Sequence, residues 1–476
     1  MSAPLHFRSL SELARGLAGG EFCSRELVDC FAQRIEALDP ALNAFRLPLL
    51  DLARDEAAAL DRERAAGRIR GPLHGLPYAA KDLFDVAGQV TTAGCPLLAD
   101  ARAQRSATVV DRLRAAGMVL LGKTNTVQFA YGGAGVNSQH GTPHNPWHAV
   151  HHLPGGSSSG SGVAVAAGLA PAALGSDTGG SVRIPAALCG VTGLKTTVGR
   201  ISRAGVYPLS WSLDSVGPLC RDVADSARLL DAMNGEDAAD ASTHGHPHTT
   251  FVLPQPAELR GLRVALAQTA FFDDADPEVS AAVHAALPVF EELGARVSAI
   301  EFPEAGEALV LNRGGLVIAG EAYTLNRRLI DEHFDELDPV VAFRMAKGRD
   351  ITAEGYLQTA WSWNALRARA HDRFREVDIV LCPTTMIPAR PLAEAEAGVE
   401  QYSALNLAYL RNTAIGNILN LCGLSVPCGF TAGGLPIGLM LYARPFAEQL
   451  LLTAGAAWQQ ATDFHTRHPV LGWTGS

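Results

Sequence analysis

Residues 155–185 alternate between segments dense in glycine and serine and segments that are almost wholly apolar. The sequence reads GGSSSGSG at 155–162, VAVAAGLAPAALG at 163–175 and SDTGGSVRIP at 176–185. A flexible linker can be rich in glycine and serine, but it lacks apolar runs that have to be buried. Glycines inside a core permit close backbone approach and positive φ, so this segment predicts tight loops within a buried structure.

The turn Thr178–Ser181 has a composition suited to acyl transfer. That reaction needs a nucleophile, a base and hydrogen-bond donors directed at a developing oxyanion. A Thr-Gly-Gly-Ser turn can direct successive backbone N–H groups to one point, because glycine lets the backbone curl inward without a Cβ clash. The turn therefore indicates serine-based acyl-transfer chemistry.

The flanking sequence alternates short apolar strands with amphipathic helices, which favours an α/β sheet. Helix-rich sequence is expected at 303–375, and the polar stretch 234–250 is expected to be a surface loop. Strands are predicted at 118–122, 262–268, 296–302 and 378–385. Helices are predicted behind a Ser24 cap, at 107–117, and at 276–294 with Asp276-Pro277 as its start and Gly294 as its end.

Composition bears on the class of partner and on the compartment. The net charge of −10 argues against a nucleic-acid binder, which usually presents a basic surface. No apolar stretch reaches the roughly 18 residues that a transmembrane helix needs, and residues 1–17 lack the apolar core of a signal peptide. Eight cysteines without a C-x-x-C pair are too sparse for a disulfide scaffold and are expected to fill the core. We therefore expect a cytoplasmic protein.

The two serine-glycine segments resemble the amidase signature family, and the resemblance extends over nearly the whole chain. It implies one amidase domain over residues 1–476, an α/β fold with a large, mixed, twisted β-sheet flanked by helices on both faces (α/β/α). The segment 303–375 would help to shape the substrate pocket. The further matching stretches are AAKDLFDVAG at 79–88, GKTNTVQFAYGG at 122–133, GTPHNPW at 141–147, LSVPCGF at 424–430 and GLPIGLMLYARPF at 434–446.

The resemblance implies a Ser-Ser-Lys triad. Ser181 would be the nucleophile, and Ser157, 24 residues earlier, would be the bridging serine that follows the family's cis peptide bond. Lys81 would be the base. The oxyanion hole would be formed by the N–H groups of Thr178, Gly179, Gly180 and Ser181.

A lysine base imposes a physical demand, because the amine accepts a proton only when it is neutral. With a reference pKa of about 10.4, an ordinary lysine is neutral less than about 1% of the time at pH 8. Burial has to lower the pKa of Lys81 by a few units, and each unit corresponds to about 1.4 kcal/mol. We therefore expect Lys81 in a buried polar environment.

Other residues in these segments offer alternative chemistry. Lys123 could compete as the base, but it lies in a motif that the family does not use for catalysis. Asp177 is expected to be structural, accepting backbone donors around its loop. A metal is not needed by a serine-lysine mechanism, and the loop-like spacing of the clustered histidines argues against a metal site at His140, His144, His148, His151 and His152.

Two positions depart from the tRNA amidotransferase subunit of the same family. Ile184, in Arg183-Ile184-Pro185, replaces a common glutamine, and Gln128 stands where that subunit usually has glutamate. Both differences favour a free-standing amidase and leave a partner subunit open. Position 128 faces the substrate in some relatives, so Gln128 and Tyr131 are candidate substrate-binding residues, with plain packing as the alternative.

The resemblance implies hydrolysis of the C–N bond of linear carboxylic amides, other than peptide bonds, without a cofactor or metal. The same tetrahedral chemistry extends to carbamates, anilides and aryl esters, so a urethanase stays open. A glutaminase subunit of a tRNA-dependent amidotransferase and a catalytically silent binding protein on the same fold are the alternatives. The expected partner is a small-molecule amide or carbamate, with no nucleic acid or membrane, and a homodimer stays open.

Overall fold

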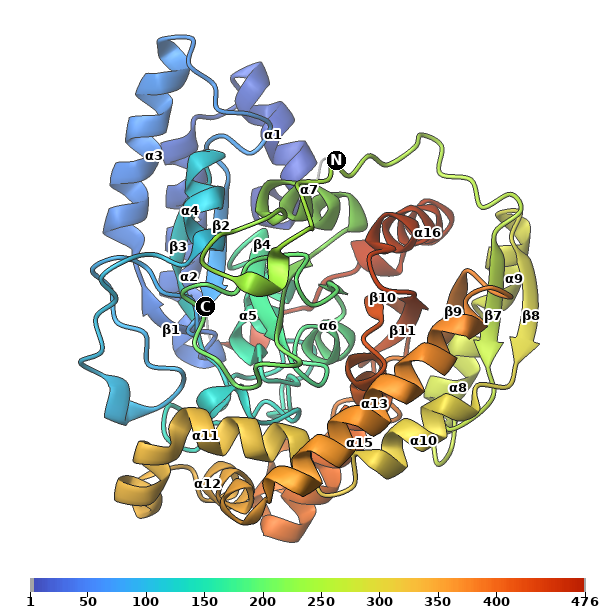
Figure 1. Ribbon diagram of the computed structural model, residues 1–476. Helices are drawn as coiled ribbons and strands as arrows, with labels where there is room; N and C mark the ends of the chain where they lie inside the picture. The colour runs from blue at the N-terminus through green and yellow to red at the C-terminus, as the bar shows by residue number, and fades with distance from the viewer. Residues whose placement is uncertain (1–3, 475–476) are drawn as a thin grey trace.

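The computed structural model describes residues 4–474, which are organised around an eleven-stranded β-sheet (Figure 1). The strand order across the sheet is β1-β3-β2-β4-β6-β5-β10-β11-β9-β7-β8. The strands are β1 (Phe45–Pro48), β2 (Pro77–Lys81), β3 (Val119–Thr124), β4 (Ala172–Asp177), β5 (Thr192–Lys195), β6 (Ser215–Cys220), β7 (Arg263–Ala267), β8 (Arg296–Ile300), β9 (Ile379–Pro383), β10 (Cys422–Phe430) and β11 (Pro436–Ala443).

The sheet is mixed, and the directions of its strands determine which candidate site residues lie close together. Strand β2 runs parallel to both β3 and β4, and β7 runs parallel to β8 and β9. The remaining strand pairs are antiparallel. Ala80 of β2 pairs with Leu174 of β4. The carboxyl ends of these two strands, at Lys81 and Asp177, therefore lie at the same edge of the sheet, where ligands commonly bind in α/β proteins.

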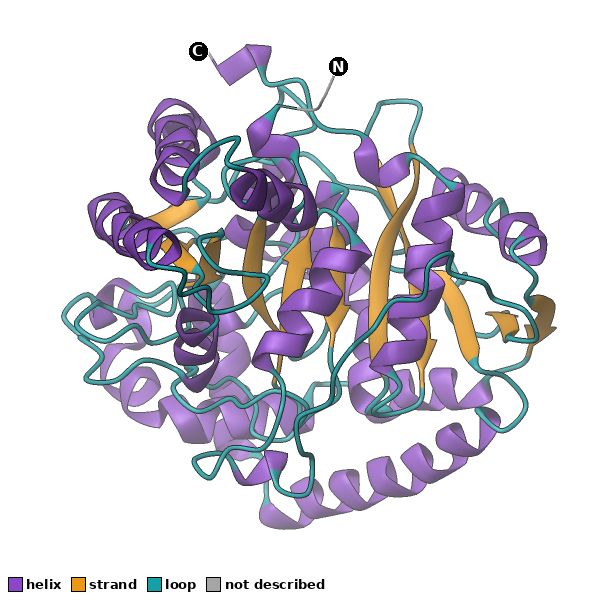
Figure 2. Ribbon diagram, turned by 90° about the horizontal axis from the view of Figure 1, so that it is seen from above, coloured by secondary structure: helices purple, strands orange, loops and turns teal. Residues whose placement is uncertain are grey.

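Helices cover both faces of this sheet (Figure 2), so strand residues are buried on both sides. Within β11, Leu439 and Leu441 belong to one hydrophobic cluster, whereas Met440 and Tyr442 belong to another on the opposite face. This arrangement confirms the predicted α/β/α class. The helices are α1 (Leu10–Gly19), α2 (Ser24–Leu42), α3 (Leu50–Ala65), α4 (Thr108–Ala115), α5 (Ser159–Ala166), α6 (Arg183–Cys189), α7 (Val223–Met233), α8 (Pro277–His284), α9 (Leu287–Glu292), α10 (Pro303–Leu311), α11 (Leu316–His333), α12 (Pro339–Ala346), α13 (Ala353–Arg373), α14 (Leu392–Glu396), α15 (Val399–Ile418) and α16 (Glu448–Ala461).

The predicted strands and helices are present, with two differences at helix boundaries. The helix expected over 276–294 is divided into α8 and α9, and Pro288 lies in the first turn of α9, where its missing N–H is tolerated. The predicted Ser24 cap is wrong by one residue: Cys23 is the N-cap of α2, and its Sγ accepts a hydrogen bond from Glu26 N–H at 3.4 Å.

The serine-glycine segment is buried, as its apolar runs predict. At Gly160, in the first turn of α5, a Cβ atom would lie 2.2 Å from Ala44 O and 2.5 Å from Asn125 N. The absence of a side chain lets α5 pack directly on the loop after β3, where Gly160 N–H donates to Asn125 O at 3.0 Å. Residues 303–375 form α10 to α13, and no helix within residues 4–474 is long and apolar enough to cross a membrane.

Candidate active site

Lys81 is the last residue of β2, and its side chain is completely buried. Its Nζ donates to Ser157 Oγ at 2.7 Å and to Ser176 Oγ at 2.9 Å. Ser176 is the next-to-last residue of the neighbouring β4, so the parallel pairing of β2 and β4 explains this second contact. The structure thus joins Lys81 to the predicted bridging serine.

Ser157 lies in the loop before α5, and the Gly156-Ser157 peptide bond is cis. The Ser157 carbonyl accepts hydrogen bonds from Thr126 Oγ1 at 2.9 Å and from Val127 N–H at 3.2 Å. These bonds attach the loop to the segment that follows β3, while the Ser157 hydroxyl faces Lys81.

The Thr178–Ser181 turn connects β4 to α6 and lies against the Ser157 loop. Ser158 N–H donates to Ser181 O at 3.3 Å, which joins the two loops next to Ser157. Ser181 is 3% exposed, and its Oγ has no hydrogen-bond partner among residues 4–474. This hydroxyl is therefore available for reaction.

The buried side chains of Asp177 and Arg183 stabilise the Thr178–Ser181 turn. The Asp177 carboxylate accepts bonds from Gly180 N–H at 2.9 Å, Val182 N–H at 3.1 Å and the Arg183 guanidinium at 2.9 and 3.0 Å. Burial alone would raise the pKa of Asp177, but the adjacent Arg183 outweighs it and holds that pKa below its ordinary value. Asp177 therefore clamps the backbone, in the structural role expected for it.

The donors available for an oxyanion differ in one respect from the predicted set. The Gly180 N–H is bound to Asp177, so it is not free to face a substrate carbonyl. Within the described part of the chain, the N–H groups of Thr178, Gly179 and Ser181 make no such bond. Gly180 contributes to the turn through its backbone conformation instead. Its φ of +137° favours glycine, and a Cβ at this position would lie 2.1 Å from Thr413 Oγ1.

The electrostatics of Lys81 meet the demand of a lysine base. Burial disfavours its ammonium form and lowers the pKa of Lys81 from 10.5 to about 7, although the carboxylates of Asp214 and Asp177 oppose this shift. About half of the molecules therefore hold Lys81 as the neutral amine at pH 7. A hydrogen bond from Ser157 to that amine would complete the proton path.

A cavity of about 640 Å³ reaches the Thr178–Ser181 turn at Gly179. Tyr131 lines this cavity together with residues of α10, α11, α12 and α15, so the 303–375 segment contributes to its wall. Gln128 does not line it. Its buried amide donates to Gln139 Oε1 at 2.7 Å and accepts from Asp338 N–H at 2.9 Å, so of the two predicted pocket residues only Tyr131 lies at the cavity.

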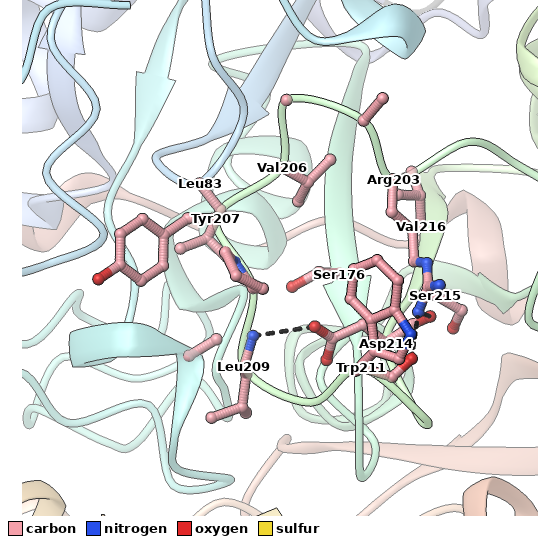
Figure 3. Close-up of a pocket in the computed structure, with 14 residues that line it drawn as sticks. Leu83, Ser176, Arg203, Val206, Tyr207, Leu209, Trp211, Asp214, Ser215 and Val216 are labelled. Atoms are coloured by element: carbon pink, nitrogen blue, oxygen red, sulfur yellow. Dashed lines mark hydrogen bonds between the residues drawn. The ribbon is translucent and has the colours of Figure 1, made fainter. Parts of the chain in front are cut away.

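A second cavity, of about 220 Å³, is lined by Ser176, Tyr207 and Trp211, among others (Figure 3). Ser176, which binds Lys81, lines this cavity, and so does Asp214. Figure 3 shows Leu209 N–H directed at the Asp214 carboxylate, a hydrogen bond of 2.9 Å. Asp214 also accepts a hydrogen bond from Thr178 Oγ1 at 2.5 Å. This bond connects the wall of the second cavity to the Thr178–Ser181 turn.

The chain is similar to known amidases in sequence and in fold. The family model described as Amidase matches residues 26–452. The chain belongs to the amidase family. It is 39% identical to a glutamyl-tRNA(Gln) amidotransferase subunit of Chromohalobacter salexigens, over 98% of this chain and 99% of that protein. It is 40% identical to the 2-amino-5-chloromuconic acid deaminase of Comamonas testosteroni, over 93% and 94%. The solved peptide amidase of Stenotrophomonas maltophilia is 31% identical, with a TM-score of 0.82 over 96% and 98% of the chains.

The second buried lysine of this amidase is engaged elsewhere. Lys123 Nζ lies 2.6 Å from Asp82 Oδ1 and donates to Val90 O and Thr91 Oγ1, both at 2.7 Å. Burial lowers the pKa of Lys123, while the Asp82 carboxylate favours its ammonium form. Lys123 has no contact with Ser157. The geometry therefore favours Lys81 over Lys123 as the base.

Four of the five clustered histidines, all except His140, place a ring nitrogen against a backbone carbonyl oxygen. His144 Nε2 lies 3.0 Å from His148 O, and His152 Nδ1 lies 2.8 Å from Val150 O. His144 stacks on His151, and burial lowers the pKa of His144 to about 4. Among the residues that the structure describes, no three His, Cys, Asp or Glu side chains are placed to hold a metal ion.

Sequence reasoning missed Ser176 and Asp214. Ser176 directly precedes Asp177 at the end of β4, and strand pairing with β2 was the signal that could have placed it beside Lys81. Asp214 carries no such signal, because it reaches Thr178 from a loop 36 residues further along the chain.

Proposed function

We propose that this amidase hydrolyses the C–N bond of carboxylic amides through an acyl-enzyme on Ser181, with Ser157 and Lys81 as a proton relay. The observation that carries the proposal is the buried contact of 2.7 Å between Lys81 Nζ and Ser157 Oγ, next to a turn whose free hydroxyl is Ser181. The lowered pKa of Lys81 supports its role as the base.

The proposed reaction balances its protons through the relay. Ser181 Oγ attacks the carbonyl carbon, its proton moves to Ser157 Oγ, and the Ser157 proton moves to Lys81 Nζ. The C–N bond then breaks, and the same relay run backwards delivers the proton to the leaving nitrogen. Water attacks the acyl-enzyme by the same path and releases the acid and Ser181.

The N–H groups of Thr178, Gly179 and Ser181 are the proposed oxyanion donors. Donors of this kind act when they lie about 3 Å from the position of the developing negative charge. Gly179 lines the large cavity, so an amide bound there has its carbonyl next to these donors. Tyr131, which also lines the cavity, is the proposed pocket residue.

Covalent labelling tests the proposal directly. A fluorophosphonate should modify Ser181, and mass spectrometry of the peptide containing residues 181–183 should show the adduct. Ser181→Ala should lose labelling and turnover together. Ser157→Ala should slow both and leave some activity, because water can bridge Lys81 and Ser181. A label on Ser157 with Ser181 untouched would reverse the two roles.

A glutaminase subunit is the second candidate, and one observation favours it: the 39% identity to the amidotransferase protein of Chromohalobacter salexigens over almost the full length of both chains. Such a subunit works with a partner and is nearly silent alone. A panel of amides, anilides, carbamates and esters, offered to the purified chain, separates the candidates. Turnover by the chain alone supports a free-standing amidase, and preferred turnover of carbamates supports a urethanase.

A further inference from the structure

The large cavity carries a charge opposite to that of the chain. The protein has a formal net charge of −10, yet no aspartate or glutamate of the described chain lines this cavity. Four basic residues do so: Arg313, Arg344, Lys347 and Arg411. No carboxylate of residues 4–474 forms an ion pair with any of the four. A hollow lined by one sign of charge focuses the field and attracts ligands of the opposite sign.

The remainder of the lining is apolar, with Leu309, Ile318, Phe343 and Leu410 among its members. A volume of about 640 Å³ is in the range of small-molecule pockets. The cavity therefore suits a small ligand that has an apolar body and a negative charge, in addition to the amide that reaches Gly179.

Arg344 on α12 is the basic residue whose position is best defined. Its guanidinium lies 4.1 Å from the centroid of the Tyr131 ring, and its Nη1 donates to Tyr131 O at 2.7 Å. The side chain is half-buried. Apart from Tyr131, no described residue accepts a hydrogen bond from this guanidinium. A guanidinium held over an aromatic ring with free donors is suited to bidentate binding of a carboxylate.

The other three cations contribute to the field rather than to a fixed contact. Arg313 and Lys347 are exposed. Arg411 is half-buried, and its charge is partly offset by Asp273 and Asp274, which lie nearby but do not line the cavity. Arg344 is thus the cation best placed to bind an anionic group at short range.

We propose that the substrate of this amidase is an amide that carries a carboxylate, which binds Arg344 while the amide carbonyl reaches the Thr178–Ser181 turn. The inference rests on the proposed amidase function and names its substrate class. Arg344 selects the substrate through its charge and its planar donors. The apolar lining holds the carbon chain between the two ends.

Three probes with the same carbon chain isolate the charge: adipic acid monoamide, hexanamide and ε-aminocaproamide. They are anionic, neutral and cationic at the end remote from the amide. Monoamides of malonic, succinic and glutaric acid cover shorter reaches. Ammonia release gives kcat/KM for each probe at low and high salt. We expect the best carboxylate probe to exceed hexanamide by at least about tenfold, with the preference falling as salt rises.

Variants identify the residue responsible. Arg344→Gln should reduce the ratio of carboxylate to neutral substrate by about tenfold or more, mainly through KM, and Arg344→Lys should give an intermediate ratio. Arg328→Gln is the matched control, because Arg328 is an exposed residue of α11 outside the cavity and, among the described residues, pairs only with Glu332. It should keep the wild-type ratio. An arginine that merely packs on Tyr131 would alter all substrates alike.

The inference and the proposed function fail in different ways. Equal turnover of the anionic, neutral and cationic probes overturns the carboxylate inference and leaves the amidase intact, as does a preference that survives Arg344→Gln. If Ser181 is not labelled and none of the amides is hydrolysed, the amidase proposal fails. Calorimetric titration of the wild-type chain with adipate then decides the inference: binding that Arg344→Gln weakens supports it, and no binding at low salt overturns it.

Discussion

The pH dependence of Ser181 acylation should reveal the buried lysine. Burial lowers the pKa of Lys81 from 10.5 to about 7, which corresponds to about 5 kcal/mol in favour of the neutral amine. Only the neutral amine accepts the proton from Ser157. The acylation rate should therefore follow the neutral fraction, rising with pH and levelling off above the pKa of Lys81.

The magnitude follows from the two pKa values. With a pKa of about 7, the neutral fraction rises from about one eleventh at pH 6 to about ten elevenths at pH 8, so the rate should increase about tenfold and then reach a plateau. With the ordinary pKa, the rate would increase about a hundredfold over the same interval and continue to rise to about pH 10. The position of the plateau distinguishes the two cases.

Single-turnover labelling by a fluorophosphonate measures this step, because no leaving amine has to be protonated. Lys81→Arg should abolish the pH-dependent phase, since a guanidinium does not lose its proton in this range. Lys123→Arg is the matched control: it keeps a cation beside Asp82 and should retain the profile. A rate that climbs without a plateau to pH 10, or a Lys81→Arg enzyme with the wild-type profile, would refute the assignment.

Three further predictions concern the turn, its clamp and the histidines. Gly180→Ala should reduce kcat/KM by orders of magnitude and lower the melting temperature, because its Cβ would collide with Thr413 Oγ1. Arg183→Met should destabilise the fold by about 3–5 kcal/mol in urea denaturation, since it leaves the Asp177 carboxylate buried without its partner. Dialysis against EDTA should leave turnover unchanged, because the proposed relay uses no metal; activity lost to EDTA and restored by zinc would assign a role to the histidines of 140–152.

The order of the strands could not be obtained from the sequence, although four of the eleven strands could. Apolar runs bounded by turns predicted β3, β7, β8 and β9 within a residue or two. The insertion of β6 between β4 and β5, and of β10 next to β5, depends on contacts that include residues more than 200 positions apart. Local periodicity carries no information about such pairs.

The residues of the candidate site likewise fall into those that the sequence predicted and those that only the structure revealed. The resemblance to the amidase signature family predicted Lys81, Ser157 and Ser181, because these residues lie in short segments that match the motifs of that family. Arg344 lies in an ordinary amphipathic helix, and only the packing of α12 beside Tyr131 brings its guanidinium to the cavity. Pocket residues on amphipathic helices are therefore harder to predict than residues in segments that match a family motif.

The Asp177–Arg183 pair connects the rigidity of the turn to the proposed reactivity of Lys81. Asp177 holds the turn through the N–H groups of Gly180 and Val182, which requires an ionised carboxylate within the core. That negative charge also favours the ammonium form of Lys81 and so opposes the lowering of its pKa. Arg183 resolves the conflict, because its bidentate contact at 2.9 and 3.0 Å offsets the carboxylate's charge while leaving its oxygens bound to the turn. Burial can then dominate at Lys81, and the same carboxylate that shapes the proposed oxyanion turn leaves the base free to lose its proton near neutral pH.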